Sequence, residues 1–307
     1  MTPENFKYLC KLLHERSGLV LSDKKAYLVE ARLMPFVRRK NLTGLDDLVL
    51  TVQRDKDENL IREITDAMTT NESFFFRDGK PFKIFRETVL PALLEKRPAG
   101  RKIRIWSAAC STGQEPYTLG MLLKEEAAKL GTRPVEIVGT DISDEALARA
   151  KEGLYTQFEV QRGLPIQLLV KYFTQEGDNR WRINKDIRDM VSLRYFNLLE
   201  DLSILGAFDI VFCRNVLIYF DQPTKIQVLD RISQRMAGDG VLFLGGAETV
   251  LGVSDAFKPI AGARGTYGLG DWEAAGDAST ATSGPPPAAE PTTTPSTVAP
   301  STPSAAS

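Results

Sequence analysis

The fold of this chain is decided by the stretch Ile103-Arg104-Ile105-Trp106-Ser107-Ala108-Ala109-Cys110-Ser111-Thr112-Gly113, which continues into Gln114-Glu115-Pro116-Tyr117 and an apolar run at 118–123. An apolar strand runs into small residues that can turn tightly, and a helix begins immediately afterwards. Nucleotide-type ligands use such βα units, because small side chains let a ligand lie against backbone amides without a Cβ clash. We therefore expect a ligand at the carboxyl end of this strand, although an ordinary strand-to-helix turn has the same pattern.

A second apolar strand at 135–141 favours the ligand-binding interpretation. It ends in Asp141, at the place where a carboxylate that binds ribose is expected. The distance along the chain from Gly113 to Asp141 exceeds the roughly 20 residues of the dinucleotide-binding fingerprint. An S-adenosylmethionine site is therefore at least as well supported as a nicotinamide site.

From residue 101 onward, strand and helix patterns alternate, which is typical of a doubly wound, mostly parallel α/β sheet. The expected strands are 103–109, 135–141, 191–197, 208–214 and 240–246, and the expected helices are 115–130, 144–152 and 222–237. The interval 154–190 breaks this rhythm, with a helix near 165–173 and a hairpin around Arg180-Trp181-Arg182-Ile183. We interpret it as a small β-containing insertion.

The first 95 residues have helical apolar spacing throughout. The first helix is expected to be capped by Thr2 and to end at Gly18, and the second to begin at Ser22 or Asp23 and to be kinked or stopped by Pro35. Further helices are expected at 45–52 and 58–68. A later helix is expected to be capped by Asp78. The predicted organisation is a helical domain at 1–70, a linker and connecting helix at 71–95, and an α/β domain at 96–270.

The last residues, 273–307, are predicted to be a disordered tail rich in Pro, Ala and Thr. Beyond Trp272 the sequence holds seven prolines, no Lys or Arg and no aromatic residue. Such a composition cannot bury enough apolar surface to offset the entropy of ordering.

Composition excludes several classes of function. The net charge of −1 gives no overall attraction to nucleic acid or anionic membranes. The three cysteines, Cys10, Cys110 and Cys213, lack paired spacing, and His14 is the only histidine, so disulfide frameworks, metal sites and histidine triads are not expected. No basic, apolar leader opens the sequence and no run approaches a membrane span, which predicts a cytoplasmic protein without metal.

A run of positive charge marks the second helix. Six cations, Lys24, Lys25, Arg32, Arg38, Arg39 and Lys40, surround the single anion Glu30. Such a run is commonly a solvated helix face, and it is also what a dock for an acidic partner requires.

Four motifs then suggest a family. They are Thr69-Thr70-Asn71-Glu72-Ser73-Phe74-Phe75-Phe76-Arg77-Asp78, Trp106-Ser107-Ala108-Ala109-Cys110-Ser111-Thr112-Gly113-Gln114-Glu115-Pro116-Tyr117, Gly139-Thr140-Asp141-Ile142-Ser143 and Phe212-Cys213-Arg214-Asn215-Val216-Leu217-Ile218-Tyr219-Phe220. With these motifs in this order, the chain resembles the CheR family of chemotaxis receptor methyltransferases over roughly residues 1 to 270.

The resemblance implies a protein-glutamate O-methyltransferase. Such enzymes move a methyl group from S-adenosylmethionine to receptor glutamates, forming γ-methyl esters for sensory adaptation and leaving S-adenosylhomocysteine. A glutamate of pKa about 4.3 is already ionised at neutral pH, so this chemistry needs no general base. The implied partners are the cytoplasmic methylation helices of chemoreceptors, with no nucleic acid, no membrane insertion and a monomeric enzyme.

The resemblance also implies a binding role for several residues. Asp141 would accept hydrogen bonds from the ribose hydroxyls, Glu115 would pair with the α-amino group, and Arg77 would bind toward the carboxylate. Asn71 and Ser73 would line the same pocket.

Further residues would complete the site. Asn197 and Leu198 would flank adenine, while Asn215 and Tyr219 would border the sulfonium and methyl group. Tyr219 and Arg77 are the expected catalytic residues, acting through alignment and desolvation of the reacting groups. The helical domain, through its basic run, is expected to dock the receptor.

The sequence departs from the family pattern at three places. Gln114 replaces a common acid, and Gly245-Gly246-Ala247-Glu248 replaces Gly-His-Ser-Glu, which puts a polar role of that loop in doubt. The connection between Phe173 and Trp181 is short and has one glycine, so we expect an enzyme that does not depend on a receptor tail peptide bound at the insertion.

Two alternative functions stay open at this stage. Asn215 and Tyr219 fall where nucleic-acid base methyltransferases place a clamp for a flipped base, although here no proline stands between them. A regulator that binds S-adenosylmethionine without catalysis is the other alternative, and the complete set of candidate site residues argues against it.

Overall fold

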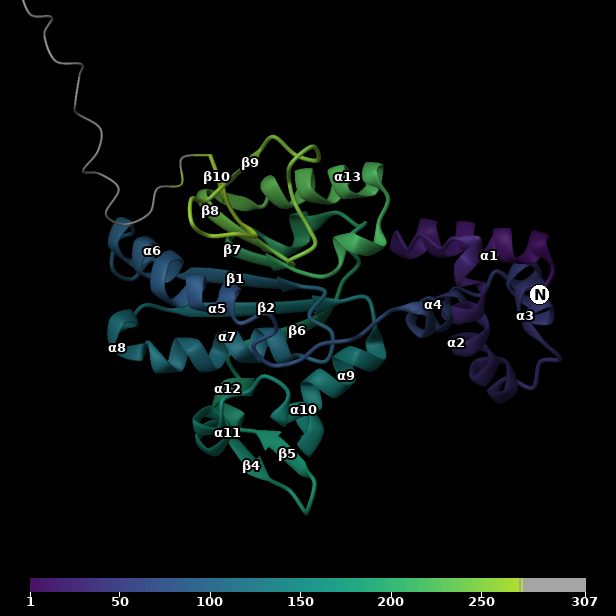
Figure 1. Cartoon of the computed structure of the whole chain (residues 1–307), viewed down its shortest axis with the longest axis horizontal. Coiled ribbons are helices and arrows are strands. Elements are labelled where there is room, and N and C mark those ends of the chain that lie inside the picture. The colour runs from purple at the N-terminus through teal and green to yellow at the C-terminus, as the bar shows by residue number, and fades with distance from the viewer. Residues whose placement is uncertain (271, 273–307) are drawn as a thin grey trace, which may run out of the picture. The chain divides into compact units, whose positions relative to one another are not determined.

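The computed structural model describes residues 1–270 and 272, so the predicted tail at 273–307 lies outside the described residues. The N-terminal part is helical (Figure 1), with the elements α1 (Pro3–Ser17), η1 (Asp23–Lys25), α2 (Ala26–Arg39), α3 (Leu45–Asp55) and α4 (Glu58–Met68). Each helix buries one apolar face in a shared core that includes Leu13, Val29 and Ile64. Amphipathic spacing therefore produces a small helical bundle.

The helix-end signals are partly confirmed. The Thr2 hydroxyl accepts the backbone N–H of Asn5, and Gly18 ends α1 in the left-handed conformation at φ 74°. The second helix is entered through the 3-10 turn η1, which begins at Asp23 as predicted and leads into α2 at Ala26. Of the kink or stop predicted at Pro35, the stop is wrong because α2 continues to Arg39. Pro35 lies on the exposed face of α2, where water can satisfy the carbonyl that a proline leaves without an intrahelical partner.

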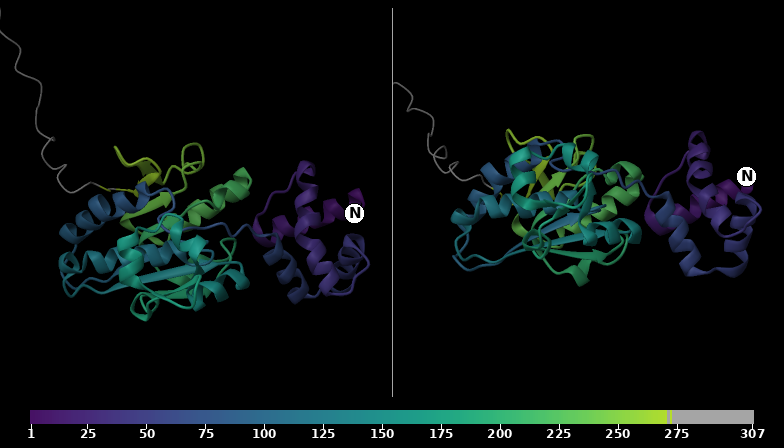
Figure 2. Two further views of the ribbon diagram at one scale, coloured as in Figure 1. Left: turned by 60° about the horizontal axis from the view of Figure 1, so that its bottom comes forward. Right: turned by 90° about the horizontal axis from the view of Figure 1, so that it is seen from below.

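A seven-stranded sheet forms the centre of the rest of the chain (Figures 1 and 2), in the order β6-β2-β1-β7-β8-β10-β9. Its strands are β1 (Ile103–Ala108), β2 (Val135–Asp141), β6 (Val191–Tyr195), β7 (Phe208–Cys213), β8 (Met236–Leu244), β9 (Phe257–Pro259) and β10 (Thr266–Leu269). The first five pair in parallel, while β10 pairs antiparallel with β8 and β9. The predicted doubly wound, mostly parallel sheet is confirmed.

Helices cover both faces of this sheet. The linked helices α5 (Lys80–Ile84), η2 (Phe85–Val89) and α6 (Leu90–Lys96) share a core with α7 (Gln114–Glu125) and one face of β1 and β7. On the other face, Val228 and Ile232 of α13 (Gln222–Ser233) pack with Trp106 and Val211. The remaining elements are α8 (Ala127–Leu130), α9 (Asp144–Glu152), η3 (Leu202–Leu205) and η4 (Leu217–Tyr219).

Two predicted boundaries are wrong for a physical reason. The helix predicted at 222–237 ends at Ser233, and the strand predicted at 240–246 already begins at Met236. Met236 pairs with Phe208 across a register irregularity, so this segment extends the ladder of β7 instead of adding a helical turn. The helix predicted at 115–130 is likewise divided at Glu126, between α7 and α8.

The insertion contains the predicted hairpin and one further strand. Its elements are β3 (Leu154–Thr156), α10 (Gln157–Gln161), α11 (Ile166–Tyr172), β4 (Phe173–Gln175), β5 (Arg180–Ile183) and α12 (Lys185–Arg188), with the antiparallel order β3-β5-β4. Phe75 packs edge-on against Tyr155 and Phe173, with ring centroids 5.0 and 5.4 Å apart. The linker between the two domains is thereby anchored on the insertion.

The boundaries predicted for the domains stay predictions. Within residues 1–270 and 272, no helix combines the length and the apolar character needed to cross a membrane.

Candidate functional site

A half-open cavity lies at the carboxyl ends of β1, β2 and β7, and its empty space, mouth included, is about 990 Å³. The chain leaves β1 toward β2 on one side and reaches β7 on the other, so the cavity occupies the switch point of the sheet, where open α/β sheets bind ligands. It is lined by Ser17, Leu19, Thr69, Thr70, Asn71, Glu72, Ser73, Arg77, Ala109, Cys110, Ser111, Glu115, Asp141, Ile142, Asn197, Leu198, Arg214, Asn215, Val216, Tyr219 and Phe220.

The turn after β1 owes its shape to three residues in the left-handed region. Ala109, Ser111 and Gly113 have φ values of 56°, 51° and 93°. A Cβ atom on Gly113 would lie 2.9 Å from the Tyr117 ring and 3.0 Å from the Cβ of Ala150. Only a residue without a side chain fits there, and non-glycine residues held at positive φ are typical of functional turns.

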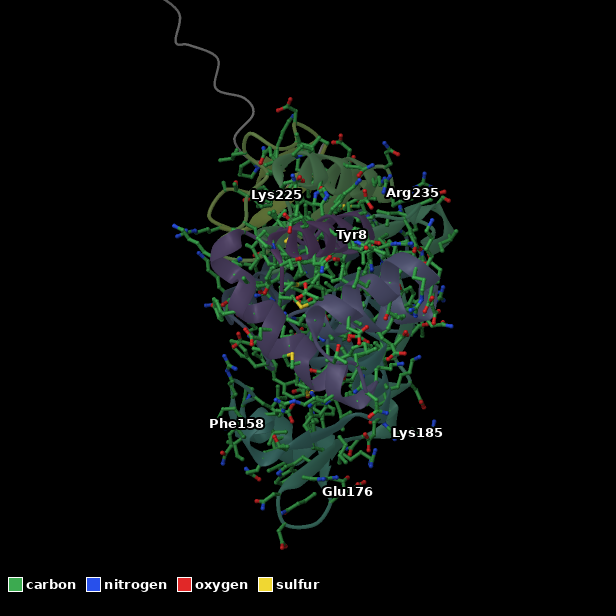
Figure 3. The ribbon with its side chains drawn as sticks, turned by 90° about the vertical axis from the view of Figure 1, so that its right-hand side faces the viewer. Tyr8, Phe158, Glu176, Lys185, Lys225 and Arg235 are labelled. Atoms are coloured by element: carbon green, nitrogen blue, oxygen red, sulfur yellow. The ribbon has the colours of Figure 1, made fainter. Side chains whose placement is uncertain are left out.

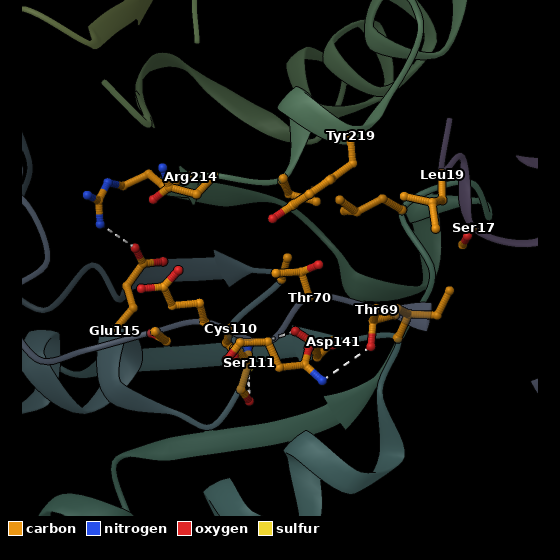
Figure 4. Close-up of a pocket in the computed structure, with 18 of the residues that line it drawn as sticks. Ser17, Leu19, Thr69, Thr70, Cys110, Ser111, Glu115, Asp141, Arg214 and Tyr219 are labelled. Carbon is orange, nitrogen blue, oxygen red and sulfur yellow. Dashed lines mark hydrogen bonds and ion pairs between the residues drawn. The ribbon is translucent and has the colours of Figure 1, made fainter. Parts of the chain in front are cut away.

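Asp141, at the end of β2, is held by this turn. One carboxylate oxygen accepts the N–H of Ser111 at 2.7 Å (Figure 4), and the other accepts the N–H of Ser143 at 2.9 Å. Burial raises the pKa of Asp141, and these backbone hydrogen bonds act in the opposite direction. The carboxylate therefore faces the cavity in a fixed position with further lone pairs available.

Glu115, at the start of α7, belongs to a charged network. Its carboxylate accepts hydrogen bonds from the Arg214 guanidinium at 2.8 Å (Figure 4) and from the Ser107 hydroxyl at 2.8 Å. Arg214 also donates to the backbone carbonyl of Arg77 and to the Asp78 carboxylate at 2.9 and 2.6 Å. The network joins β1, α7, β7 and the linker around one side of the cavity.

Sequence reasoning assigned no role to Arg214 and a wrong role to Asp78. The Arg214 side chain is 1% exposed, and its buried Nε has no hydrogen-bond partner in the described structure. The helix after the linker is capped by Gly79, without a side-chain bond, because Asp78 turns to Arg214 at φ 68°. The available signal was the position of Arg214 inside the motif 212–220, directly before Asn215.

The linker contributes Asn71, Ser73 and Arg77 to the cavity wall. The side-chain amide of Asn71 donates to the hydroxyls of Thr69 and Ser143, both at 3.2 Å, and the backbone carbonyl of Asn71 accepts from the Ser111 hydroxyl. Arg77 donates to the backbone carbonyl of Glu72 at 2.7 Å. The linker is thus hydrogen-bonded to the turn after β1, through Ser111, and to the turn after β2, through Ser143.

Asn197 and Leu198 lie on the wall after β6. The Asn197 amide donates to the backbone carbonyl of Arg16 at 2.7 Å, and its oxygen accepts the N–H of Leu199. The end of α1 and the loop after it also reach the cavity, since Ser17 and Leu19 line it, which sequence reasoning did not anticipate.

Asn215 and Tyr219 close the side formed by the turn after β7. Asn215 has φ 60°, and the hydroxyl end of Tyr219 points into the cavity (Figure 4). The Tyr219 carbonyl accepts the N–H of Val20 at 2.9 Å. All nine residues predicted for the cofactor and for catalysis therefore line one cavity.

The remaining candidate groups in the described residues have other surroundings. Cys110 is buried at the cavity wall, and burial raises its pKa well above the ordinary value. His14 bonds Asp221 at 3.0 Å and is not among the lining residues. Within the described ranges no group of three or more His, Cys, Asp or Glu side chains is arranged for a metal ion.

The predicted receptor-binding cations lie at different places along α2. Lys24 and Lys25 are exposed at its beginning, and Arg38, Arg39 and Lys40 are exposed at its end. Lys40 and Arg39 lie 2.9 and 3.8 Å from the Glu63 carboxylate.

Arg32 differs from the other cations because it is half-buried in the middle of α2. Its guanidinium donates to the carbonyls of Met68 and Thr69 at 2.5 and 3.0 Å and to the hydroxyl of Thr70 at 2.9 Å. Its charge faces residues 68–70, directly before the linker, instead of open solvent.

Comparison with known proteins identifies a SAM-binding domain in the part of the chain that contributes most of the residues lining the cavity. Residues 71–266 match the family model "CheR methyltransferase, SAM binding domain", and residues 4–69 match "CheR methyltransferase, all-alpha domain". Among solved structures, the glycopeptide N-methyltransferase MtfA complexed with sinefungin aligns with 56% of this chain and 50% of its own, at 12% identity and a TM-score of 0.33, too low to add support.

Curated relatives cover most of the chain. Chemotaxis protein methyltransferase Cher2 of Pseudomonas putida is 39% identical over 259 residues, which are 83% of this chain and 94% of the relative. Chemotaxis protein methyltransferase 1 of Pseudomonas aeruginosa is 40% identical with the same coverage, and that of Vibrio cholerae is 37% identical over 85% of this chain and 94% of its own. From both family models and these relatives, the chain belongs to the CheR methyltransferase family.

Proposed function

We propose that this enzyme transfers the methyl group of S-adenosylmethionine to glutamate side chains of chemoreceptors, forming γ-methyl esters for sensory adaptation and leaving S-adenosylhomocysteine. The observation that supports it most directly is the set of charged groups around one cavity, Asp141, Glu115 and Arg77. A ribose diol, an ammonium and a carboxylate, the polar groups of this cofactor, are complementary to these three side chains.

The charges of the network fit that assignment. Arg214 contacts both Glu115 and Asp78, so the group of one guanidinium and two carboxylates has a net charge of −1. This net negative charge is available to a cofactor ammonium. Arg77 donates to the neutral backbone carbonyl of Glu72, so its charge is available for the cofactor carboxylate. Glu115 is held by the Ser107 hydroxyl and Arg214, and Arg77 by the Glu72 carbonyl, before a ligand binds, which lowers the cost of binding.

The proposed reaction needs little general acid–base catalysis from the protein. S-adenosylmethionine supplies an electrophilic methyl group, and the glutamate carboxylate, ionised at neutral pH, is the nucleophile. The residues Tyr219 and Asn215 would border the reacting atoms, and the apolar side chains of Leu19, Val216 and Phe220, which also line the cavity, would exclude water there. Alignment and desolvation are therefore the expected sources of rate enhancement.

The two ends of α2 are the proposed dock for the acidic receptor helix. The helix α2 is fourteen residues long, which corresponds to about 20 Å between the basic groups at its two ends. Exposed pairs are individually weak and are screened by salt, so the dock depends on several of them acting together.

We further propose that recognition does not require a receptor tail peptide at the insertion. The β4–β5 hairpin is joined by only four residues, 176–179, and Glu176 near its tip (Figure 3) forms a bidentate pair with Arg182 at 2.5 and 3.0 Å. Titrating an aromatic-ended receptor-tail pentapeptide into the protein by calorimetry tests this, and micromolar binding would contradict it. A monomeric enzyme in the cytoplasm completes the proposal.

A methyl-release assay tests the function itself. The protein is incubated with S-adenosylmethionine labelled in the methyl group and with purified receptor fragments, and base-labile methanol is measured. Fragments whose candidate glutamates are replaced by Gln are the matched control and should take up no label. Label transfer to oligonucleotides instead, or cofactor binding without any ester, would refute the proposal and favour a base methyltransferase or a non-catalytic regulator respectively.

A further inference from the structure

The loop 245–248 after β8 carries a polar contact that sequence reasoning had put in doubt. The Glu248 side chain is 9% exposed, and its carboxylate accepts four backbone N–H groups. One oxygen accepts from Gly245 at 2.6 Å and Asn215 at 2.8 Å, and the other accepts from Val216 at 2.9 Å and Ile218 at 3.3 Å. Three of the four donors belong to the turn that leads to Tyr219.

That turn needs an external restraint. Asn215 is held at φ 60°, a conformation that costs a non-glycine residue energy and persists only where surrounding contacts impose it. Val216 follows with φ −122° as the cap of η4, which carries Tyr219. A carboxylate that binds the N–H groups of three residues in this turn supplies such a restraint through charge-assisted bonds.

The packing around Glu248 leaves little freedom. A Cβ atom on Gly245 would lie 2.7 Å from both the Asn215 Nδ2 and the Glu248 Oε2, and 2.9 Å from the Asn215 nitrogen. The turn after β8 therefore lies directly against the turn after β7. The two turns are joined through one carboxylate at the cavity edge.

We infer that Glu248 is a positioning residue for the methyl-transfer reaction: it holds the turn 215–218 so that Asn215 and Tyr219 keep their places on the cavity wall. It is not among the cavity-lining residues, so it acts through them. The inference rests on the proposed function for its kinetic readout, because Tyr219 is placed beside the transferred methyl group there.

The decisive substitution is Glu248→Gln, which keeps the shape of the side chain. A glutamine has one acceptor oxygen and directs an NH₂ donor at two of the four N–H groups, so the turn loses half of its restraint. The expected result is a fall in kcat of about tenfold or more, with the Kd for S-adenosylhomocysteine changed by less than about threefold. Glu159→Gln is the matched control, because the Glu159 carboxylate accepts the Thr156 N–H and hydroxyl at the start of α10.

A double-mutant cycle separates positioning from general stability. In a Tyr219→Phe background, Glu248→Gln should change kcat much less than in the wild type, because residues that act through a shared group are not additive. Equal losses in both backgrounds, or an equal loss in Glu159→Gln, would overturn the inference. If Glu248→Gln does not fold, Glu248→Asp and Gly245→Ala perturb the same contact while retaining the charge, and unchanged kcat in both would overturn it.

A crystal structure of Glu248→Gln gives a readout that does not depend on the substrate. A displaced turn at 215–218 is expected even if the wild-type enzyme proves to methylate something other than a receptor, whereas an undisturbed turn refutes the positioning role. Failure of the proposed function would instead appear as a wild-type enzyme without receptor methylation.

Discussion

Replacing Asp141 by Ala tests the cofactor site most directly. The carboxylate already accepts the N–H groups of Ser111 and Ser143, one on each oxygen, so the remaining lone pairs are fixed in direction toward the cavity. A hydrogen bond to a charged group contributes about 1.5–3 kcal/mol. Loss of one such bond to the ribose lowers cofactor affinity by about tenfold to a hundredfold, and loss of two lowers it further.

Isothermal calorimetry with S-adenosylhomocysteine measures this effect, at a temperature at which thermal unfolding scans show each variant to be folded. Asp144→Ala is the matched control, because that carboxylate lies three residues away and pairs with Arg62 at the surface instead of facing the cavity. A Kd for Asp141→Ala within about twofold of the wild type would refute the assignment of Asp141 to the ribose.

The same carboxylate predicts a pH dependence with a definite sign. Burial raises the pKa of Asp141, so the group takes up a proton at a higher pH than an exposed aspartate. Protonation removes the negative charge that strengthens its bonds to hydroxyl groups. Cofactor affinity of the wild type should therefore fall as the pH is lowered, while the affinity of Asp141→Asn stays weak and changes less over the same range.

Three further predictions concern catalysis, docking and stability. Tyr219→Phe should lower kcat more than cofactor affinity, and the opposite pattern in steady-state kinetics contradicts its place beside the methyl group. Arg38→Glu combined with Arg39→Glu should reduce receptor methylation steeply at low salt while calorimetry shows unchanged cofactor binding; unaltered methylation would make the basic run a solvated face. Burial alone would raise the pKa of Asp239, but the hydrogen bonds from Arg97 outweigh burial and lower that pKa. The interaction therefore stabilises the fold above the unfolded-state pKa of Asp239, and this stabilisation is lost as the pH falls through the folded-state pKa. Asp239→Asn should lower Tm at neutral pH and flatten the fall of Tm in acid, which thermal scans at several pH values measure.

Many of the residues that line the cavity could be predicted from the sequence, because the topology of the sheet decides which residues lie together. In a parallel sheet the carboxyl ends of neighbouring strands meet at one edge, so Glu115, Asp141 and Asn215, each at or just after a strand, had to lie close together. Their clustering needed only the order of strands and helices. The roles assigned to these residues stay predictions until binding and kinetics are measured.

The parts that sequence reasoning missed depend on contacts between distant residues. Glu248 bonds backbone groups about thirty positions away, and no local pattern marks a side chain whose partners are all main-chain N–H groups. Asp78 looked like a helix cap because it precedes a helix, yet an ion pair with Arg214 proved the stronger interaction for its carboxylate. Helix and strand ends shifted for the same reason, as the pairing of Met236 with Phe208 shows.

The half-buried Arg32 predicts that the proposed receptor docking and cofactor binding are linked equilibria. It is part of the helix proposed to receive the receptor, and its guanidinium grips Met68, Thr69 and Thr70, the last two of which line the cavity. We expect receptor binding that shifts α2 to change cofactor affinity through this contact, and the coupling free energy is then the same in both directions because linkage is reciprocal. Receptor affinity measured with and without S-adenosylhomocysteine should therefore differ by the same factor as cofactor affinity measured with and without the receptor.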